Sequence, residues 1–426
     1  MFPTVSRPAQ DSVIDRSVKR GSLRRMPVFD VAIVGGGIVG LATATEFLSK
    51  RPTATLTVLE KERQVGSHQT THNSGVIHSG IYYRPGSLKA KACVAGAKLM
   101  IEFCQAHQIP HAICGKVIVA TEESELPRLH ALYERGLANG VPGVSMIGPE
   151  RLRDIEPHAR GLKALHVRSA GIVDYGSVAR VMAECVRRRG GTIQTSAAVH
   201  RTVKSDGVWI LETTAGDVRA RFLVTCGGLY ADRLTALAGG PRDLLIIPFR
   251  GEYYEVVAER RVLVNTMIYP VPDPALPFLG VHFTRTVSGA LHAGPNAVLA
   301  LKREGYRKRD VSVVEALRVL TYPGFWRMAS RHWLAGMQEL YRSWSKRAFV
   351  HALQRLVPEV RIEDLVPGGA GVRAQALNVE GLLIDDFNVV QQPQAIHVRN
   401  VPSPAATASI PIGRFIADLM MLSMTP

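Results

Sequence analysis

The chain has few of the features that mark disulfide-rich, metal-binding or membrane-spanning proteins. It carries five cysteines in 426 residues. This odd number, with no CxxC pair, argues against a disulfide framework or a zinc site and favours a reducing compartment. We therefore expect buried thiols and no bound metal. The apolar run 31–48 contains glycines and Glu46, so it indicates a strand followed by a helix and not a membrane span.

Acidic residues are scarce relative to basic ones. The 36 Asp and Glu residues face 52 Lys and Arg residues, which gives a formal net charge of +16. This excess favours an anionic partner, such as a dicarboxylate substrate or an acidic membrane surface, although a generally basic proteome explains it equally well. The basic residues lack the aromatic-interleaved stripe of nucleic-acid-binding proteins, so we expect no nucleic acid partner.

The composition is that of a globular protein, with 46% hydrophobic and 21% charged residues, and the length suffices for two domains. We find no internal repeat. Residues 1–28 are expected to form a tail outside the fold, either disordered, a targeting segment or an upstream extension of the reading frame.

The most informative stretch is a glycine-rich turn between a hydrophobic strand and a helix. The strand 31–34 leads into Gly35-x-Gly37-x-x-Gly40, a helical segment follows, and a second strand ends at Glu60. This order and spacing are typical of a dinucleotide-binding βαβ unit. The fingerprint alone does not distinguish FAD from NAD.

Each part of this unit has a physical role. Gly35 makes the tight turn, Gly37 lets the backbone approach a pyrophosphate, and Gly40 lets the helix pack close to the strand. The helix N-terminus presents free N–H groups and a positive dipole end to the phosphates. Glu60 accepts hydrogen bonds from ribose hydroxyls.

Periodicity and turn residues predict the remaining elements. Helices are expected at 87–107, 123–139, 177–189 and 231–238 and within 312–357, and a small antiparallel sheet from strands at 192–199, 206–213 and 218–224. A glycine-rich bend is expected at 367–371, just before Arg373. The segment Pro402-Ser-Pro404 is expected to open the final helix and to supply a second anion-binding cradle.

Several sequence blocks resemble the L-2-hydroxyglutarate dehydrogenases, which are FAD-dependent enzymes of the D-amino-acid-oxidase-like family. The similarity covers roughly 29–420 and rests on Gly35–Gly40, His72–Tyr83, Leu88–Lys91, Gly171–Tyr175, Pro248–Gly251, Gly280–Thr284, Gly294–Asn296, Gly371–Gln375 and Pro402–Thr407. It implies noncovalent FAD and oxidation of L-2-hydroxyglutarate to 2-oxoglutarate, with electrons passed to a non-NAD acceptor, either a quinone or an electron-transfer protein.

The resemblance also implies the fold: α/β, with a Rossmann-like FAD-binding domain and a second, substrate domain of mixed sheet plus helices. The FAD-binding domain is expected at 29–80, 160–245 and 363–421, and the substrate domain at 81–159 and 246–362. The protein is expected to be cytoplasmic or peripheral on the inner membrane in a bacterium, and mitochondrial in a eukaryote.

The implied reaction removes a hydride from an α-carbon and a proton from its hydroxyl, so the protein must supply a base. A neutral imidazole is the simplest base near neutral pH. We favour His78, because the preceding apolar run carries it inward. His72, His282 and His292 are rivals, and each is alternatively a hydrogen-bonded structural histidine.

The implied substrate is a dianion, and arginine binds a carboxylate in a bidentate manner. Arg250 and Arg373 are the best candidates, and each is alternatively part of a structural ion pair. Further substrate contacts are expected from Tyr269, His282, Arg285 and Asn296. Arg373 is also expected to act in catalysis and to approach the flavin ring.

The cofactor is expected to contact the glycine-rich turn, the polar loop after Glu60, a second glycine turn and the start of the last helix. These residues are Gly35, Gly37, Ile38, Gly40, Glu60, Lys61, Ser67, Thr70, Thr71, His72, Asn73, Ser74, Gly75, Val199, Cys226, Gly227, Gly228, Arg373, Ser403, Ala405, Ala406 and Thr407.

Two questions stay open at this level. The segment 321–356 combines three tryptophans with six basic residues and is either a membrane-surface helix pair or, as we favour, a helix pair that packs its aromatics inward. The same flavin fold also serves other substrates, such as a different hydroxy acid, an amino acid or glycerol 3-phosphate.

Overall fold

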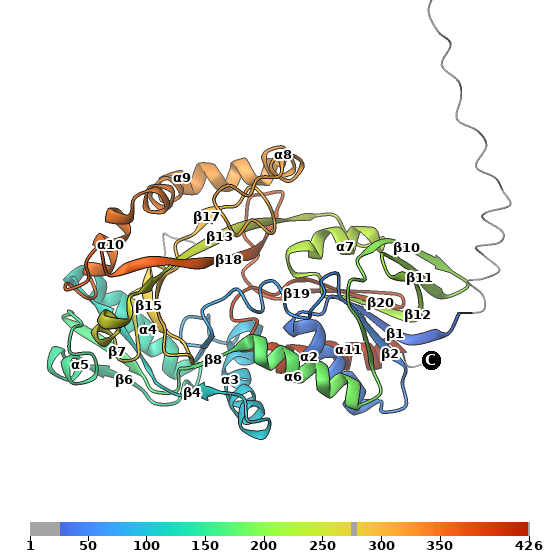
Figure 1. The fold of residues 1–426 in the computed structure, drawn as a ribbon, viewed down its shortest axis with the longest axis horizontal. Helices are drawn as coiled ribbons and strands as arrows, with labels where there is room; N and C mark the ends of the chain where they lie inside the picture. The colour runs from blue at the N-terminus through green and yellow to red at the C-terminus, as the bar shows by residue number, and fades with distance from the viewer. Residues whose placement is uncertain (1–25, 274–278, 425–426) are drawn as a thin grey trace, which may run out of the picture.

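The computed structural model describes residues 26–273 and 279–424, and two large sheets organise them (Figure 1). The predicted tail 1–28 lies almost entirely outside the described residues. The first sheet has the order β10-β11-β12-β1-β2-β9, with β20 paired to β12 and β19 to β20. Its strands are β1 (Val28–Val34), β2 (Leu56–Leu59), β9 (Thr192–Gln194), β10 (Val199–Ser205), β11 (Val208–Thr213), β12 (Gly216–Thr225), β19 (Asn388–Gln392) and β20 (Ala395–Asn400).

The predicted antiparallel strands are not a separate small sheet. The ten-residue β12 pairs antiparallel with β11 through its first half and parallel with β1 through its second half, from Arg219 to Thr225. One long strand therefore joins the antiparallel hairpins to the parallel β1, β2 and β9. The local sequence does not reveal this because strand pairing is a tertiary choice.

Helices cover both faces of the first sheet. The helices α2 (Ile38–Lys50), α6 (Tyr175–Arg188) and α11 (Ser409–Met424) lie together below it in Figure 1, and α7 (Ala231–Leu237) lies above it. Helix α11 packs closely on α2, because a side chain at Gly413 would meet the backbone of Ala42 at 2.6 Å. The helix α3 (Leu88–Ala106) contacts α11 and completes this layer.

The second sheet has the order β17-β13-β16-β15-β14-β5-β7-β6, with β18 paired to β13. Its strands are β5 (Lys116–Ala120), β6 (Val144–Ile147), β7 (Lys163–Val167), β13 (Leu244–Val256), β14 (Met267–Pro270), β15 (His282–Arg285), β16 (Leu291–Gly294), β17 (Val298–Leu299) and β18 (Leu365–Asn378). Two sheets with helices packed on them confirm the predicted α/β class.

The expected glycine-rich bend at 367–371 is wrong. These residues lie inside β18, which pairs antiparallel with β13 along most of its length, with an irregularity between Glu252 and Tyr254. Pairing with β13 continues on both sides of these residues, and the local turn preference produces only a bulge at Gly368 and Gly369, where Gly369 has φ +89°. Both β7 and β18 belong to the second sheet, although the predicted ranges assign them to the FAD-binding domain.

Shorter elements complete the fold. A three-stranded sheet has the order β3-β8-β4 and sits between the two large sheets. The remaining elements are β3 (Val76–Ile77), β4 (His111–Ala112), β8 (Gly171–Val173), α4 (Leu126–Ala138), α5 (Pro149–Ile155), α8 (Val313–Leu320), α9 (Pro323–Trp344) and α10 (Lys346–Gln354), with 3-10 turns at Glu123–Glu125, Gly228–Tyr230 and Ala258–Leu263.

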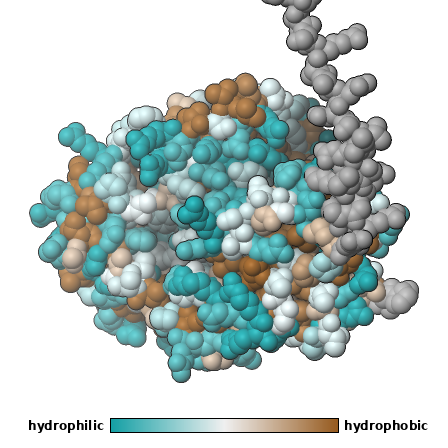
Figure 2. All heavy atoms as spheres, turned by 45° about the vertical axis from the view of Figure 1, so that its right-hand side comes forward, coloured by the Kyte–Doolittle hydropathy of each residue, from teal (hydrophilic) through white to brown (hydrophobic). Residues whose placement is uncertain are grey.

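Helices α8 and α9 expose their large apolar side chains. The side chains of Trp326, Trp333 and Trp344 are 59%, 65% and 76% exposed, so the inward-packing alternative is wrong for these tryptophans. Brown atoms mark apolar residues along the top of Figure 2, the level at which α8 and α9 lie in Figure 1. Among the described helices, none is both long and apolar enough to cross a bilayer.

Candidate cofactor and substrate site

The glycine-rich turn is closely packed at two of its three signature glycines. Gly35 has φ +119°, and a side chain there would meet the carbonyl oxygen of Cys226 at 2.3 Å. A side chain at Gly40 would meet the carbonyl oxygen of Gly35 at 2.0 Å. Within 4 Å of a side chain at Gly37, by contrast, there is only the hydroxyl of Thr70, at 3.6 Å. The backbone at Gly37 is therefore open to a ligand.

This open backbone faces a cavity of about 570 Å³ between the first sheet and the start of the last helix. Its lining combines the first βα turn, the second glycine turn at Cys226 and the segment before α11. The predicted cofactor residues that line it are Gly35, Gly37, Ile38, Gly40, Glu60, Lys61, Ser67, Thr70, Val199, Cys226, Gly227, Gly228, Ala405 and Ala406. Segments from both ends of the chain thus meet at one cavity.

Two polar side chains hold the turn in place. The buried carboxylate of Glu60 accepts hydrogen bonds from the N–H groups of Gly36 (2.8 Å) and Glu62 (2.9 Å). The hydroxyl of Thr70 accepts from the N–H of Ile38 at 3.1 Å and keeps its own proton for a ligand. A preorganised turn with free donors and an open glycine fits the pyrophosphate and ribose of FAD.

Other predicted cofactor residues shape the loop instead of lining the cavity. Thr71 donates to the carbonyl of Gly66 at 3.0 Å, and the ring of His72 stacks on Tyr306 with centroids 4.2 Å apart. The side chain of Asn73 donates to the carbonyl of Thr70 and accepts from the N–H of Gly75. Thr71, His72, Asn73, Ser74, Gly75, Arg373, Ser403 and Thr407 are absent from the cavity lining, and their cofactor contacts stay predictions.

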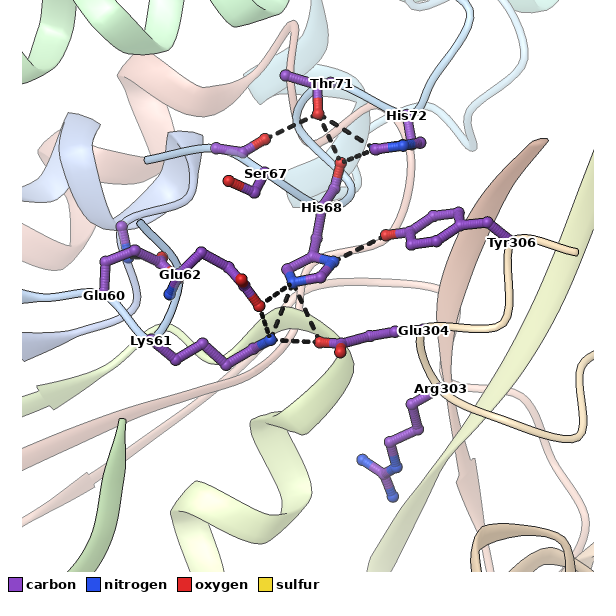
Figure 3. A network of polar contacts seen from close by, with 12 residues as sticks. Glu60, Lys61, Glu62, Ser67, His68, Thr71, His72, Arg303, Glu304 and Tyr306 are labelled. Carbon is purple, nitrogen blue, oxygen red and sulfur yellow. Dashed lines mark hydrogen bonds and ion pairs between the residues drawn. The ribbon is translucent and has the colours of Figure 1, made fainter. Parts of the chain in front are cut away.

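A polar network closes one side of the cavity (Figure 3). The ammonium of Lys61 lies 2.5 Å from carboxylate oxygens of both Glu62 and Glu304. His68 contacts the same two carboxylates, at 3.0 and 3.1 Å, and its Nδ1 lies 2.9 Å from the hydroxyl of Tyr306. The network joins the loop after β2 to residues 304–306, and of its members sequence reasoning identified Lys61 but not Glu62, His68, Glu304 or Tyr306.

The acids and histidine of this network have the spacing of metal ligands. Ligand atoms of Glu62, His68 and Glu304 lie within 4.8 Å of one another. Lys61 already supplies a cation to both carboxylates. Burial lowers the pKa of Lys61, but the hydrogen bonds to Glu304 and Glu62 outweigh burial and raise the pKa above its usual value. A protonated lysine accounts for the cluster without an ion.

His78 lies at the end of β3, with its backbone held by two neighbours. Its N–H donates to the hydroxyl of Thr407 at 3.1 Å, and its carbonyl accepts from the thiol of Cys93 at 3.3 Å. Its ring Nδ1 is buried without a hydrogen-bond partner in the described part of the chain. Burial, followed by electrostatic interactions with Lys116, His282 and Lys89, lowers the pKa of His78 to about 3. The imidazole is therefore neutral in the chain alone, but a pKa this low also makes it a weak proton acceptor until a nearby negative charge raises it.

Lys116 is a residue that sequence reasoning missed. It opens β5, its side chain is about as buried as any in the core at 1% exposed, and its ammonium lies 4.5 Å from the ring centroid of Tyr82 and 4.7 Å from that of Tyr269. Burial lowers the pKa of Lys116 to about 7. The signal was present in Lys116-Val-Ile-Val-Ala120, where a charged side chain starts a fully apolar strand.

Predicted substrate residues of the second sheet gather around this lysine. The rings of Tyr269 and His282 lie tilted by 30° with centroids 3.9 Å apart, and His282 Nδ1 donates to the carbonyl of Gly280 at 2.8 Å. Burial lowers the pKa of His282 to about 3, and the charges of Arg373 and Lys116 both contribute. His282 is therefore within electrostatic reach of both cations.

Arg373 lies on β18, where this strand approaches the cofactor loop. A side chain at Gly371 would meet the carbonyl oxygen of His72 at 2.2 Å, so the two segments touch. The guanidinium of Arg373 donates to the carbonyl of Asn296 at 3.3 Å. Burial lowers the pKa of Arg373, and its charge in turn acts on the hydroxyl of Tyr253.

Comparison with known proteins places this geometry in a family. The family model described as FAD dependent oxidoreductase, DAO, matches residues 30–419. The chain belongs to this family. Cofactor and reaction class follow: the protein is an FAD-dependent oxidoreductase, as the resemblance implied.

Relatives with higher sequence identity carry a more specific name. This oxidoreductase is 48% identical to the L-2-hydroxyglutarate dehydrogenase of Indibacter alkaliphilus, over 92% of this chain and 98% of the relative. It is 46% identical to the mitochondrial enzyme of that name from Homo sapiens, over 92% and 88% of the two chains. The Escherichia coli enzyme of that name is also 46% identical, over 92% and 93%.

Solved structures confirm the fold. The L-alpha-glycerophosphate oxidase of Mycoplasma pneumoniae superposes with a TM-score of 0.75 at 23% identity, covering 94% of this chain and 96% of that one. The glycine oxidase of Geobacillus kaustophilus gives 0.69 at 21% identity, over 94% and 96%. At these identities the likeness concerns the fold alone.

Two predicted substrate arginines of the oxidoreductase are occupied by other contacts. Arg250 is buried and donates twice to one carboxylate oxygen of Glu252, at 3.0 and 2.9 Å. Arg285 donates to the carbonyls of Val264 (2.9 Å) and Arg261 (2.8 Å). These contacts are those of arginines that stabilise the fold. A contact of either residue with the substrate stays a prediction.

Asn296 belongs to the same structural network as Arg250. Its side chain accepts from the N–H of Glu252 at 2.7 Å and donates to the carboxylate of Glu252 at 2.9 Å. Its backbone carbonyl meanwhile holds Arg373. Asn296 therefore connects the buried Arg250–Glu252 pair to Arg373 on β18.

Proposed function

We propose that this oxidoreductase oxidises L-2-hydroxyglutarate to 2-oxoglutarate, with FAD held by the first sheet and the substrate held by the second. The observation that carries the proposal is the buried cationic cluster of the second sheet. Arg373 and Lys116 are both within electrostatic reach of His282, and a dianion with two separated carboxylates matches two separated cations. The name shared by the relatives supports the same substrate.

Bound FAD supplies the hydride acceptor. The chain's own residues bind and orient the hydroxy acid and remove its hydroxyl proton. Arg373 holds the carboxylate next to the reacting carbon, because a guanidinium binds a carboxylate with fixed planar geometry. His78 accepts the proton at its buried ring, whose Nδ1 atom has no hydrogen-bond partner among the described residues. Its pKa is low in the chain alone, and the negative charge of the bound dianion raises this pKa toward the range that a base requires. Thr407 and Cys93 orient His78 through its backbone.

The experiment is reduction of the purified yellow enzyme without air. L-2-hydroxyglutarate is expected to bleach the flavin absorbance, and the D enantiomer is not. A panel with glycerol 3-phosphate, glycine and other 2-hydroxy acids supplies the comparison. If one of these compounds reduces the flavin faster than L-2-hydroxyglutarate, the substrate assignment is wrong. A colourless protein that takes up no FAD would contradict the enzyme assignment itself.

We further propose that α8 and α9 bring the enzyme onto an anionic membrane surface, where a quinone or an electron-transfer protein accepts the electrons. The exposed tryptophans of α9 are accompanied by the exposed apolar residues Val313, Val314, Leu317, Leu334, Met337, Leu340 and Tyr341. Exposed basic residues, Arg318, Arg327, Arg331 and Arg347, interleave with them. Apolar anchors with basic neighbours are the pattern of a membrane-surface helix.

Vesicle binding tests this proposal. The enzyme is expected to sediment with vesicles that contain anionic phospholipid and much less with neutral ones. Replacing Trp333 and Trp344 with serine is expected to weaken binding about tenfold or more, because burial of one large apolar side chain contributes about 2 kcal/mol. Leu137→Ser, at an apolar residue on α4 that is 48% exposed, is the control. Equal binding of all variants would place the contact elsewhere.

A further inference from the structure

Lys116 carries an ammonium group for which the described residues provide no hydrogen-bond acceptor. Its contacts are the faces of the Tyr82 and Tyr269 rings. Cation–π contacts compensate part of the desolvation of a charge, but a buried ammonium normally has an acceptor as well. The position of Lys116 at the start of β5 is therefore costly unless an acceptor comes from outside the chain.

Lys89 is a second buried lysine, and its ammonium group has acceptors within the chain. Lys89 is 8% exposed, and its ammonium donates to a carboxylate oxygen of Asp385 at 2.8 Å and to the Asp385 carbonyl at 3.0 Å. The acidic group that acts on Lys116 is instead the thiol of Cys93. Burial raises the pKa of that thiol to about 12, so it carries no charge to offer.

The side chains near Lys116 also carry buried polar atoms without hydrogen-bond partners among the described residues. The hydroxyl of Tyr82 and the Nδ1 atom of His78 are buried and lack hydrogen-bond partners in the described chain, as does the hydroxyl of Ser79 beside His78. Elsewhere in the site the polar groups of Glu60, Thr70 and Asn296 are all bonded. A group of donors without acceptors is the complement of an anion with several lone pairs.

We propose that Lys116 binds the distal carboxylate of a dicarboxylic 2-hydroxy acid, with the Tyr82 hydroxyl as a second donor. The inference rests on the proposed function, in which Arg373 holds the other carboxylate. No hydrogen bond fixes the Tyr82 hydroxyl, but its ring packs against the core beside Lys116, so this ring has to shift to admit the anion to the ammonium. Lys116 is thus the residue that selects a dicarboxylate over a hydroxy acid with a neutral end.

The test uses the FAD-loaded enzyme and a pair of substrates that differ only at the distal end: L-2-hydroxyglutarate and its 5-carboxamide, L-2-hydroxyglutaramate. The wild type is expected to prefer the dianion by about 10²-fold or more in kcat/KM, since an unpaired buried charge strongly disfavours the neutral analogue. Lys116→Met is expected to reduce this preference to less than about tenfold, mainly through loss of activity on the dianion. Lys89→Met is the matched control and is expected to keep the preference.

A second readout does not depend on turnover. Glutarate, which has no hydroxyl to oxidise, is expected to raise the thermal midpoint and perturb the flavin spectrum of the wild type but not of Lys116→Met. If Lys116→Met does not accumulate with bound flavin, Lys116→Gln serves in both assays. An unchanged preference together with unchanged glutarate binding in the variant overturns the role of Lys116. A wild type that binds glutarate through Lys116 but does not oxidise L-2-hydroxyglutarate contradicts the proposed function alone.

Discussion

The cavity of the first sheet and the cationic cluster of the second sheet differ in how their polar groups are satisfied. At the glycine-rich turn of the cavity, Glu60 and Thr70 are bonded to the backbone, so the turn is held in shape by the chain. Elsewhere in the lining, Arg233 Nε and Arg399 Nε have no hydrogen-bond partner among the described residues. In the cluster, His78, Tyr82 and Lys116 each keep a buried polar atom without a hydrogen-bond partner in the described residues. The glycine-rich turn keeps its shape without further partners, so it suits any dinucleotide. The buried polar atoms of the cluster find hydrogen-bond partners only when a particular anion binds.

The cavity is built to bind phosphate groups in general, and the cluster is built to recognise one specific kind of anion. Backbone N–H groups and a helix N-terminus bind phosphate whatever the rest of the ligand is. Desolvated charges discriminate strongly, because the wrong ligand leaves them unpaired in a low dielectric. We therefore expect changes in the cavity to affect the flavin content of the protein, and changes in the cluster to affect rate and selectivity with the flavin still bound.

The largest effect is expected from Gly40→Ala. The added methyl group would lie 2.0 Å from the carbonyl oxygen of Gly35, and backbone on both sides has to shift. The purified variant is expected to have lost nearly all of its flavin absorbance. Gly336→Ala on α9 is the control, because its methyl group meets nothing within 4 Å and is expected to stabilise the helix by up to about 1 kcal/mol. Normal flavin content in Gly40→Ala would show that the turn is not tightly constrained.

His78→Gln is expected to slow flavin reduction by about 10²-fold or more, because the base is lost, while the visible spectrum of the bound flavin stays normal. Rapid mixing with L-2-hydroxyglutarate in the absence of air measures the rate. His282→Gln provides the comparison, since His282 has a similarly low pKa of about 3. A near-normal rate in His78→Gln with a large loss in His282→Gln would move the base to His282.

The pH dependence of kcat/KM is expected to have its descending limb on the alkaline side. Burial lowers the pKa of Lys116 to about 7, so above this pH the free enzyme loses the positive charge that binds a dianion, and kcat/KM falls about tenfold per pH unit. His78, with a pKa of about 3, is neutral above pH 5 and adds no acidic limb near pH 6.5.

The same pH series with L-2-hydroxyglutaramate is the control for Lys116. This substrate has no distal charge, so its profile is expected to lack the alkaline limb near pH 7, as is the profile of Lys116→Met with either substrate. An alkaline limb that persists in Lys116→Met would assign the ionisation to another group.

The smallest effect is expected from Lys61→Met in the network beside the cavity. Lys61 and its two acidic partners are partly exposed, and such pairs contribute up to about 1 kcal/mol each. FAD affinity, measured by fluorescence titration of the apoprotein, is expected to fall about three- to tenfold. Lys98→Met, from an exposed pair with Glu102, is expected to change nothing. Dialysis against EDTA is also expected to leave flavin content unaltered, and a loss would indicate a metal at Glu62, His68 and Glu304.

Local sequence was sufficient for the phosphate-binding turn of the cofactor site. The order of strand, glycine turn, helix and acid predicted β1, α2, β2 and Glu60, because a phosphate-binding turn is built from residues that are close along the chain. The resemblance carried by the longer blocks supplied the FAD dependence and the two-part fold, and the family match confirms both. His78 was singled out by a short apolar run, and the structure buries its Nδ1 atom as that run indicated.

The substrate half depended on contacts between distant segments. Lys116, Tyr269 and Arg373 come from β5, β14 and β18, and no spacing along the chain indicates that such strands share a sheet. The misread bend at 367–371 has the same cause, because pairing with β13 decides the conformation of those residues. Phosphate recognition arises within one βαβ unit, whereas desolvating Lys116 takes strands and loops from much of the chain, and only folding brings them together.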